Sequence, residues 1–137
     1  MSAAHYRLKM RVYYEDTDAA GIVYHANYLK FMERARTEWL RSLGFEQDAL
    51  AREHGIGFVV RSATLDFVRP ARFNDELLST VQVERCGRAS VDLVQHVLHA
   101  DGGLLCGGRV RVGAVHLGRM APQAMPESVY LGIRNAY

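Results

Sequence analysis

Two carboxylates and a histidine stand close together in a short segment near the N-terminus. Asp16 and Asp18 are separated by one residue, Gly21 follows, and His25 precedes an amphipathic stretch that begins at Asn27. A carboxylate can attack an acyl carbon or activate water, and a main-chain N–H can stabilise the oxyanion that forms. The first N–H groups of a helix lack partners within the helix and attract negative charge. This pattern indicates acyl transfer, with Asp18 as nucleophile or general base and the N–H near His25 as oxyanion donor.

The same residue types also have ordinary structural roles. Asp and Asn are common helix caps, each contributing about 1 kcal/mol, and they favour turns. By spacing alone, capping and turn formation are the simpler interpretation of Asp16, Asp18 and Asn27. The residues by themselves therefore define a candidate loop and leave its role open.

Hydrophobic periodicity shows which elements flank this loop. Apolar residues alternate with polar ones from Tyr6 to Tyr14, which predicts a strand with one buried face that leads into the loop. After Asn27, apolar residues recur every three or four positions and predict an amphipathic helix that ends at Gly44. The stripe consists of Tyr28, Met32, Ala35, Trp39 and Leu43. A short second helix is expected over 46–54, closed by Gly55.

The rest of the chain reads as strands joined by turns. Alternation predicts strands over 59–67, 77–84 and 104–114, and a less regular strand over 90–100 that is partly covered on both faces. One strand, one long helix and about four further strands indicate an α+β domain, in which an antiparallel sheet wraps around one long central helix. We expect this single domain to span 1–137 and to leave the other sheet face and the sheet edges available for dimer formation.

Composition excludes several other classes of protein. The chain has 137 residues, is 49% hydrophobic, and has a formal net charge of +2, which fits one globular domain and argues against nucleic-acid binding. No apolar run is long enough to span a membrane, and Met1–Lys9 has no signal-peptide core, so we expect a cytoplasmic protein. Cys86 and Cys106 are expected to be reduced and structural. His96 and His99 are spaced for opposite faces of a strand, so no metal site is expected.

One long motif resembles a known family. The run Val12–Glu33 contains Asp-x-Asp-x-x-Gly-x-Val-Tyr-His-x-Asn-Tyr and closely resembles the signature of YbgC-like acyl-CoA thioesterases, which belong with the 4-hydroxybenzoyl-CoA thioesterases in the hotdog superfamily. The likeness continues through Ala35–Arg41 and Val68–Ala71 to Met125–Pro126 and covers nearly the whole chain. It implies a hotdog fold and hydrolysis of an acyl-CoA to free acid and CoA, without a cofactor.

The resemblance also assigns roles to single residues. It places the catalytic carboxylate at Asp18 and the backbone N–H that polarises the thioester carbonyl at His25, while Tyr24 and Asn27 shape the pocket and fix the helix start. In the turn 85–90, Arg88 and Ser90 are expected to approach the nucleotide end of CoA, because Arg suits phosphate.

The resemblance implies partners as well. We expect a homodimer or homotetramer whose facing subunit completes the acyl pocket, and association with acyl carrier protein or enzymes of phospholipid synthesis.

Two competing functions remain. A hotdog dehydratase would carry a His-Phe-Pro motif, which this chain lacks. A non-catalytic protein that binds acyl-CoA or acyl carrier protein, or that scaffolds enzymes of phospholipid metabolism, is the main alternative. Saturable acyl-CoA binding without thiol release would distinguish it from a thioesterase. The acyl group that is accepted stays open.

Overall fold

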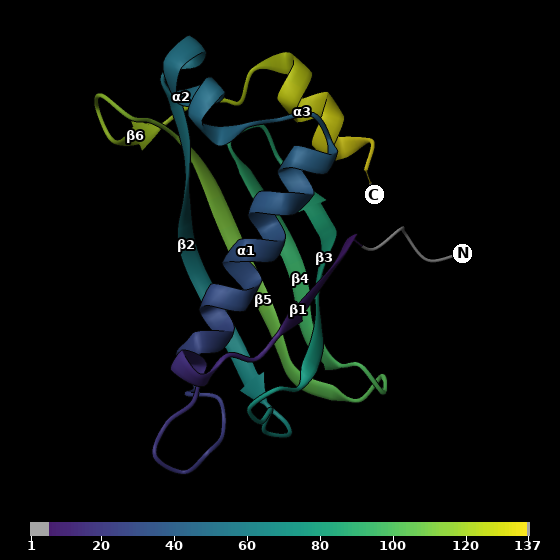
Figure 1. Cartoon of the computed structure of the whole chain (residues 1–137). Helices are drawn as coiled ribbons and strands as arrows, with labels where there is room; N and C mark the ends of the chain where they lie inside the picture. The colour runs from purple at the N-terminus through teal and green to yellow at the C-terminus, as the bar shows by residue number, and fades with distance from the viewer. Residues whose placement is uncertain (1–5, 137) are drawn as a thin grey trace.

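A sheet curved around one long helix dominates the computed structural model, which describes residues 6–136 (Figure 1). Residues 1–5, part of the segment assessed for a signal peptide, and Tyr137 lie outside the described residues. The strand order is β1-β3-β4-β5-β2, with β6 beside β5, and every pairing is antiparallel. The elements are β1 (Tyr6–Arg11), α1 (Asn27–Ser42), α2 (Gln47–His54), β2 (Ile56–Phe67), β3 (Glu76–Cys86), β4 (Ser90–His99), β5 (Leu104–His116), β6 (Ala121–Pro122) and α3 (Glu127–Arg134). The predicted α+β architecture is confirmed.

Helix α1 packs on the concave side of the sheet through its apolar stripe. Phe31, Met32 and Ala35 are fully buried, and burying side chains as large as the first two stabilises a fold by about 1.5–3 kcal/mol each. Gly44 follows the helix with φ 94°, a left-handed conformation that glycine adopts without strain. Gly55, with φ 66°, follows α2 in the same way, so the predicted ends of both helices are confirmed.

Polar side chains from the sheet also hold α1. Ser79 on β3 donates its hydroxyl to the carbonyl of Phe31 (2.9 Å), and Gln95 on β4 donates to the carbonyl of Met32 (3.0 Å). Both side chains are fully buried, so each bond satisfies a group that burial would otherwise penalise. These contacts fix the helix against the two central strands. As predicted, β4 is covered on both faces, because its buried residues alternate with half-buried ones.

Three sequence predictions need correction. The first strand ends at Arg11 rather than Tyr14, because the chain turns away to form a 3-10 turn over Tyr14–Asp16, and Tyr14 is 81% exposed. Alternation from Leu104 to Ala114 predicts that Leu104 shares one side of its strand with Cys106 and Val110, but Leu104 is partly exposed, while Leu105 is fully buried. A C-terminal helix, α3, was not predicted at all.

Strand β2 forms one edge of the sheet, and its second half is open to solvent. Val60 is 50% exposed and Phe67 is 53% exposed, and the residues between them are exposed or half-buried. Within residues 6–136 the outer edge of β2 pairs with no other strand. A long exposed edge strand with unpaired backbone groups is a site where another strand can add.

Candidate active site

The loop between β1 and α1 is held by the segment that follows β2. Val23 donates its N–H to the carbonyl of Ala71 (2.9 Å), and Ile22 forms an antiparallel bridge with Arg72. A second bridge joins Thr17 to Val23 across the loop. The loop lies below the N-terminal end of α1 in Figure 1, beside the end of β2.

Asp16 is a buried clamp for this loop. One carboxylate oxygen accepts a hydrogen bond from the Asn27 side-chain amide (2.7 Å), and the other accepts the N–H of Tyr13 (2.8 Å). The Asp16 carbonyl accepts the N–H of Tyr24 (3.0 Å). Asp16 is only 3% exposed and Asn27 7%, so the pair ties the start of α1 to the loop.

Asp18 lies two residues further and is exposed. Its Oδ1 accepts the N–H of Ala20 (2.8 Å), and its backbone closes a turn through bonds with Ile22 and Gly21. No residue within 6–136 donates a hydrogen bond to its Oδ2. One carboxylate oxygen is therefore oriented by the turn, and the other is available to a substrate or a water molecule.

His25 stands immediately before the first turn of α1. Its backbone N–H donates to no acceptor among the described residues, whereas the N–H of Asn27 donates to Tyr24 (2.8 Å). An unpaired N–H before a helix is suited to hold negative charge. The His25 ring packs against Tyr24 (4.6 Å between ring centroids) and edge-on against Phe67 (6.1 Å).

A shallow pocket of about 240 Å³ opens beside His25. It is lined by Ile22, Val23, His25, Tyr28, Phe67, Val68, Arg69 and Pro70. Tyr28 accepts the N–H of Ala71 through its hydroxyl oxygen (3.1 Å), and burial raises the pKa of Tyr28, so the phenol stays neutral. The pocket is mainly apolar and lies between the loop and the end of β2.

Arg88 and Ser90 are not near this loop within one chain. They lie at the β3–β4 turn, at the opposite end of α1, whose 16 residues span roughly 24 Å (Figure 1). Arg88 pairs with Glu127 on α3 (2.8 Å) and stacks over the ring of Tyr130 (4.2 Å). Half-buried Ser90 accepts the N–H of Gly87 through its carbonyl (2.8 Å). The structure thus brings together Asp18, Tyr24, His25 and Asn27, and separates Arg88 and Ser90 from them.

Sequence reasoning missed two contributors to this region. It did not distinguish buried Asp16 from exposed Asp18, although a hydrogen-bonding Asn eleven residues later was a possible signal. It also missed Phe67, whose approach to His25 depends on how β2 ends beside the loop. No local pattern encodes that approach.

Other kinds of site are not formed by the described residues. Residues 6–136 contain no group of three His, Cys, Asp or Glu side chains that could hold a metal ion. None of the helices over that range is long and apolar enough to cross a membrane. Cys86 and Cys106 are both free thiols, as predicted.

Comparisons with known proteins identify the family. A model described as the thioesterase-like superfamily matches residues 12–132. The acyl-CoA thioesterase YbgC of Haemophilus influenzae is 43% identical over 120 residues, covering 88% of each chain. The acyl-CoA thioester hydrolase YbgC of Escherichia coli O6:H1 is 42% identical over 129 residues, covering 94% of this chain and 96% of that one.

Solved structures agree with the sequence relatives. A probable thioesterase from Bartonella henselae has a TM-score of 0.85 and 34% identity, covering 90% of this chain and 100% of that one. The predicted hotdog fold is therefore confirmed. Because the family model matches residues 12–132 and the two YbgC relatives are 42–43% identical over most of both chains, the chain belongs to the thioesterase-like superfamily, among the YbgC-like acyl-CoA thioesterases.

Proposed function

We propose that the protein hydrolyses an acyl-CoA thioester to the free acid and CoA, and that Asp18 is its catalytic carboxylate. One observation carries the proposal: the exposed carboxylate of Asp18 and the backbone N–H of His25, which has no acceptor within residues 6–136, lie on one loop before α1. Relatives at 42–43% identity are named as acyl-CoA thioesterases or thioester hydrolases, which supports the assignment.

The proposed reaction follows from these two groups. The Asp18 carboxylate attacks the thioester carbonyl, or takes a proton from a water molecule that attacks it. The His25 N–H stabilises the oxyanion, which collapses as the C–S bond breaks, and the CoA thiolate leaves and takes up a proton. In the covalent route, water then hydrolyses the mixed anhydride on Asp18, so both routes yield the same acid and CoA. The Ala20 N–H holds one oxygen of Asp18 and leaves the other to react.

We further propose that two copies pair antiparallel along β2. The exposed part of β2 runs from Val60 to Phe67, so pairing about its middle covers all of this exposed stretch. The loop before α1 of one copy then comes to the end of the molecule that carries Arg88 and Ser90 of the other. This arrangement explains how residues so far apart in one chain could serve one CoA, with Arg88 near its phosphates. We expect this dimer, alone or within a tetramer, to act in the cytoplasm.

The first test removes the charge of Asp18. Purified Asp18→Asn should release thiol from an accepted acyl-CoA with kcat lowered about 100-fold or more, because the amide can neither attack nor accept a proton. Asp48→Asn is the matched control, since Asp48 is an exposed carboxylate on α2. Equal turnover in the Asp18 and Asp48 variants would remove Asp18 from the mechanism.

A second arm separates the His25 N–H from its side chain. His25→Ala keeps the N–H and should retain most of the activity, whereas His25→Pro removes it and should lower kcat about 100- to 1,000-fold. Circular dichroism and melting temperature confirm that both variants fold. Similar losses in the two variants would assign the role to the imidazole instead.

The alternative is a non-catalytic acyl-CoA or acyl-carrier-protein binding or scaffolding protein of phospholipid metabolism. The bond from Ala20 to Asp18 favours it, because that bond is also what a plain turn requires. This alternative would be established if the protein binds members of an acyl-CoA panel saturably but releases thiol from none of them.

A further inference from the structure

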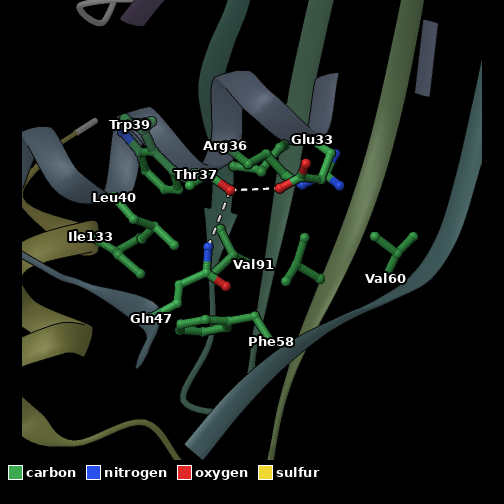
Figure 2. Close-up of a pocket in the computed structure, with 12 residues that line it drawn as sticks. Glu33, Arg36, Thr37, Trp39, Leu40, Gln47, Phe58, Val60, Val91 and Ile133 are labelled. Carbon is green, nitrogen blue, oxygen red and sulfur yellow. Dashed lines mark hydrogen bonds between the residues drawn. The ribbon is translucent and has the colours of Figure 1, made fainter. Parts of the chain in front are cut away.

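A second pocket, of about 190 Å³, lies between α1, α2, α3 and the sheet (Figure 2). Its two ends differ in character. Glu33 and Val60 stand at one end, and Trp39, Leu40 and Ile133 stand together at the other. The full lining is Glu33, Arg36, Thr37, Trp39, Leu40, Gln47, Phe58, Val60, Val91, Leu93, Val112 and Ile133. The interior is mainly apolar and is enclosed by residues from three helices, α1, α2 and α3, and three strands, β2, β4 and β5.

The polar side chains that line this pocket come from α1 and α2. Thr37 donates its hydroxyl to Glu33 (2.6 Å) and accepts the side-chain amide of Gln47 (3.3 Å), and these bonds are drawn in Figure 2. Arg36 donates to buried Gln95 (3.0 Å), and burial lowers the Arg36 pKa. These side chains are engaged with one another, which leaves the apolar walls as the surface that a ligand would cover.

The proposed dimer determines which end of the pocket is the mouth. In antiparallel pairing about the middle of β2, Val60 of one copy faces Phe67 of the other. Phe67 packs against His25 at the end of the Asp18 loop. The reacting loop of the second copy therefore comes to the Val60 end, and an acyl chain attached to a thioester there would extend toward Trp39, Leu40 and Ile133.

We propose that this pocket receives a linear aliphatic acyl chain and that Ile133 on α3 closes its inner end, which sets the longest chain the protein accepts. This inference rests on the proposed thioesterase function. A cavity of about 150 Å³ can hold benzene, so about 190 Å³ suits roughly six to eight carbons. Along α1, Glu33 to Leu40 spans roughly 10 Å at the usual helical rise, which fits a chain of that length.

Ile133 is well fixed for this role. It is 1% exposed, and the neighbouring Gly132 lies so close to Phe45 that a Cβ there would stand 2.7 Å from the ring. The close contact with Phe45 holds α3 down on the domain. A rigid wall distinguishes chain lengths sharply, because one methylene in a hydrophobic pocket changes kcat/KM about 10- to 200-fold.

The test measures kcat/KM across straight-chain acyl-CoAs from four to fourteen carbons. Ile133→Ala should move the optimum toward chains about two carbons longer and raise kcat/KM for chains just beyond the wild-type limit about tenfold. Ile133→Val should give a smaller shift in the same direction, and it keeps the test decisive if the alanine variant folds poorly. Val129→Ala is the matched control, since Val129 is 1% exposed on the same helix but does not line the pocket.

A binding measurement reports on the pocket independently of catalysis. Trp39 is the only tryptophan and lines the inner end, so its fluorescence should change when straight-chain fatty acids bind. The longest fatty acid that changes the signal should lengthen in Ile133→Ala and not in Val129→Ala.

The outcomes separate the two proposals. The role of Ile133 is overturned if Ile133→Ala and Ile133→Val accept the same longest acyl chain as the wild-type protein, both in kcat/KM and in the fluorescence measurement. Suppose that the wild-type protein releases thiol from no acyl-CoA, while fatty acids still change the Trp39 fluorescence and the longest effective fatty acid is longer in Ile133→Ala. That result would refute the thioesterase function and support the acyl pocket.

Discussion

At the scale of the residue, two aspartates of the same loop have opposite surroundings. Asp16 is buried, and both of its oxygens accept hydrogen bonds, while Asp18 is exposed and one of its oxygens has no donor within residues 6–136. A carboxylate that is fully hydrogen-bonded stabilises a structure, and one that is half free can react. The loop therefore divides anchoring and the proposed chemistry between neighbouring side chains of the same type.

Loss of the anchor should affect stability and activity together. Asn27→Ala leaves one oxygen of the buried Asp16 carboxylate without its donor, so the free energy of unfolding should fall by about 1–3 kcal/mol in urea titrations. Thiol release should fall as well, because the loop is no longer tied to α1. Asn135→Ala, at an exposed site after α3, should change neither. Unchanged stability in Asn27→Ala would show that the bond to Asp16 contributes little.

Sequence located this site and proposed roles for its residues, but it could not predict which of them are buried or what they contact. The motif from Asp16 to Asn27 correctly marks a loop before a helix, because turn residues and apolar periodicity are local signals. Which carboxylate is buried depends on which one accepts the hydrogen bond from the Asn27 side chain. The contact between His25 and Phe67 depends on β2, a strand that follows much later in the chain. Both are tertiary effects.

At the scale of the element, long periodic segments were predictable and a short one was not. Helix α1 carries four turns of apolar stripe and ends at a left-handed glycine, so its limits could be inferred. Helix α3 has only eight residues, and its two buried residues, Val129 and Ile133, are four apart. Pro126 directly before it was a start signal. A pattern this short does not distinguish a helix from a loop, and packing on the sheet decides it.

A buried thiol on strand β5 should make the protein less stable at alkaline pH. Cys106 is fully buried there, and burial raises its pKa from 9.0 to about 11. Between those values the folded protein retains a proton that the unfolded chain loses, so the stability it contributes is lost as pH rises. Wild-type protein should therefore lose about 1 kcal/mol more than Cys106→Ala between pH 8 and 10, measured by urea unfolding.

An internal control accompanies that measurement. Between pH 6 and 8 the thiol is protonated in both states, so the stability difference between wild type and Cys106→Ala should stay constant. A difference that is equally constant from pH 8 to 10 would contradict the expected titration of Cys106.

At the scale of the whole molecule, the open edge of β2 should govern assembly. Ala63 is exposed near the middle of that edge, so Ala63→Glu places two like charges close together in an antiparallel dimer. The molar mass of Ala63→Glu measured by light scattering should fall to that of the monomer, and thiol release should fall as well. Ala100→Glu, at an exposed turn away from β2, should retain both. An Ala63→Glu variant with the wild-type mass would exclude pairing along β2.

The bonds that join the loop before α1 to residues 71–75 also affect how the protein is made. Val12 donates its N–H to Asp75, and Val23 donates to Ala71, so the loop with Asp18 is held by residues that leave the ribosome much later. A nascent chain cannot complete this loop until residues 71–75 have emerged from the exit tunnel. The loop with Asp18 therefore forms only after its support has been synthesised, and truncated products that end before residue 71 contain the motif but not the folded loop.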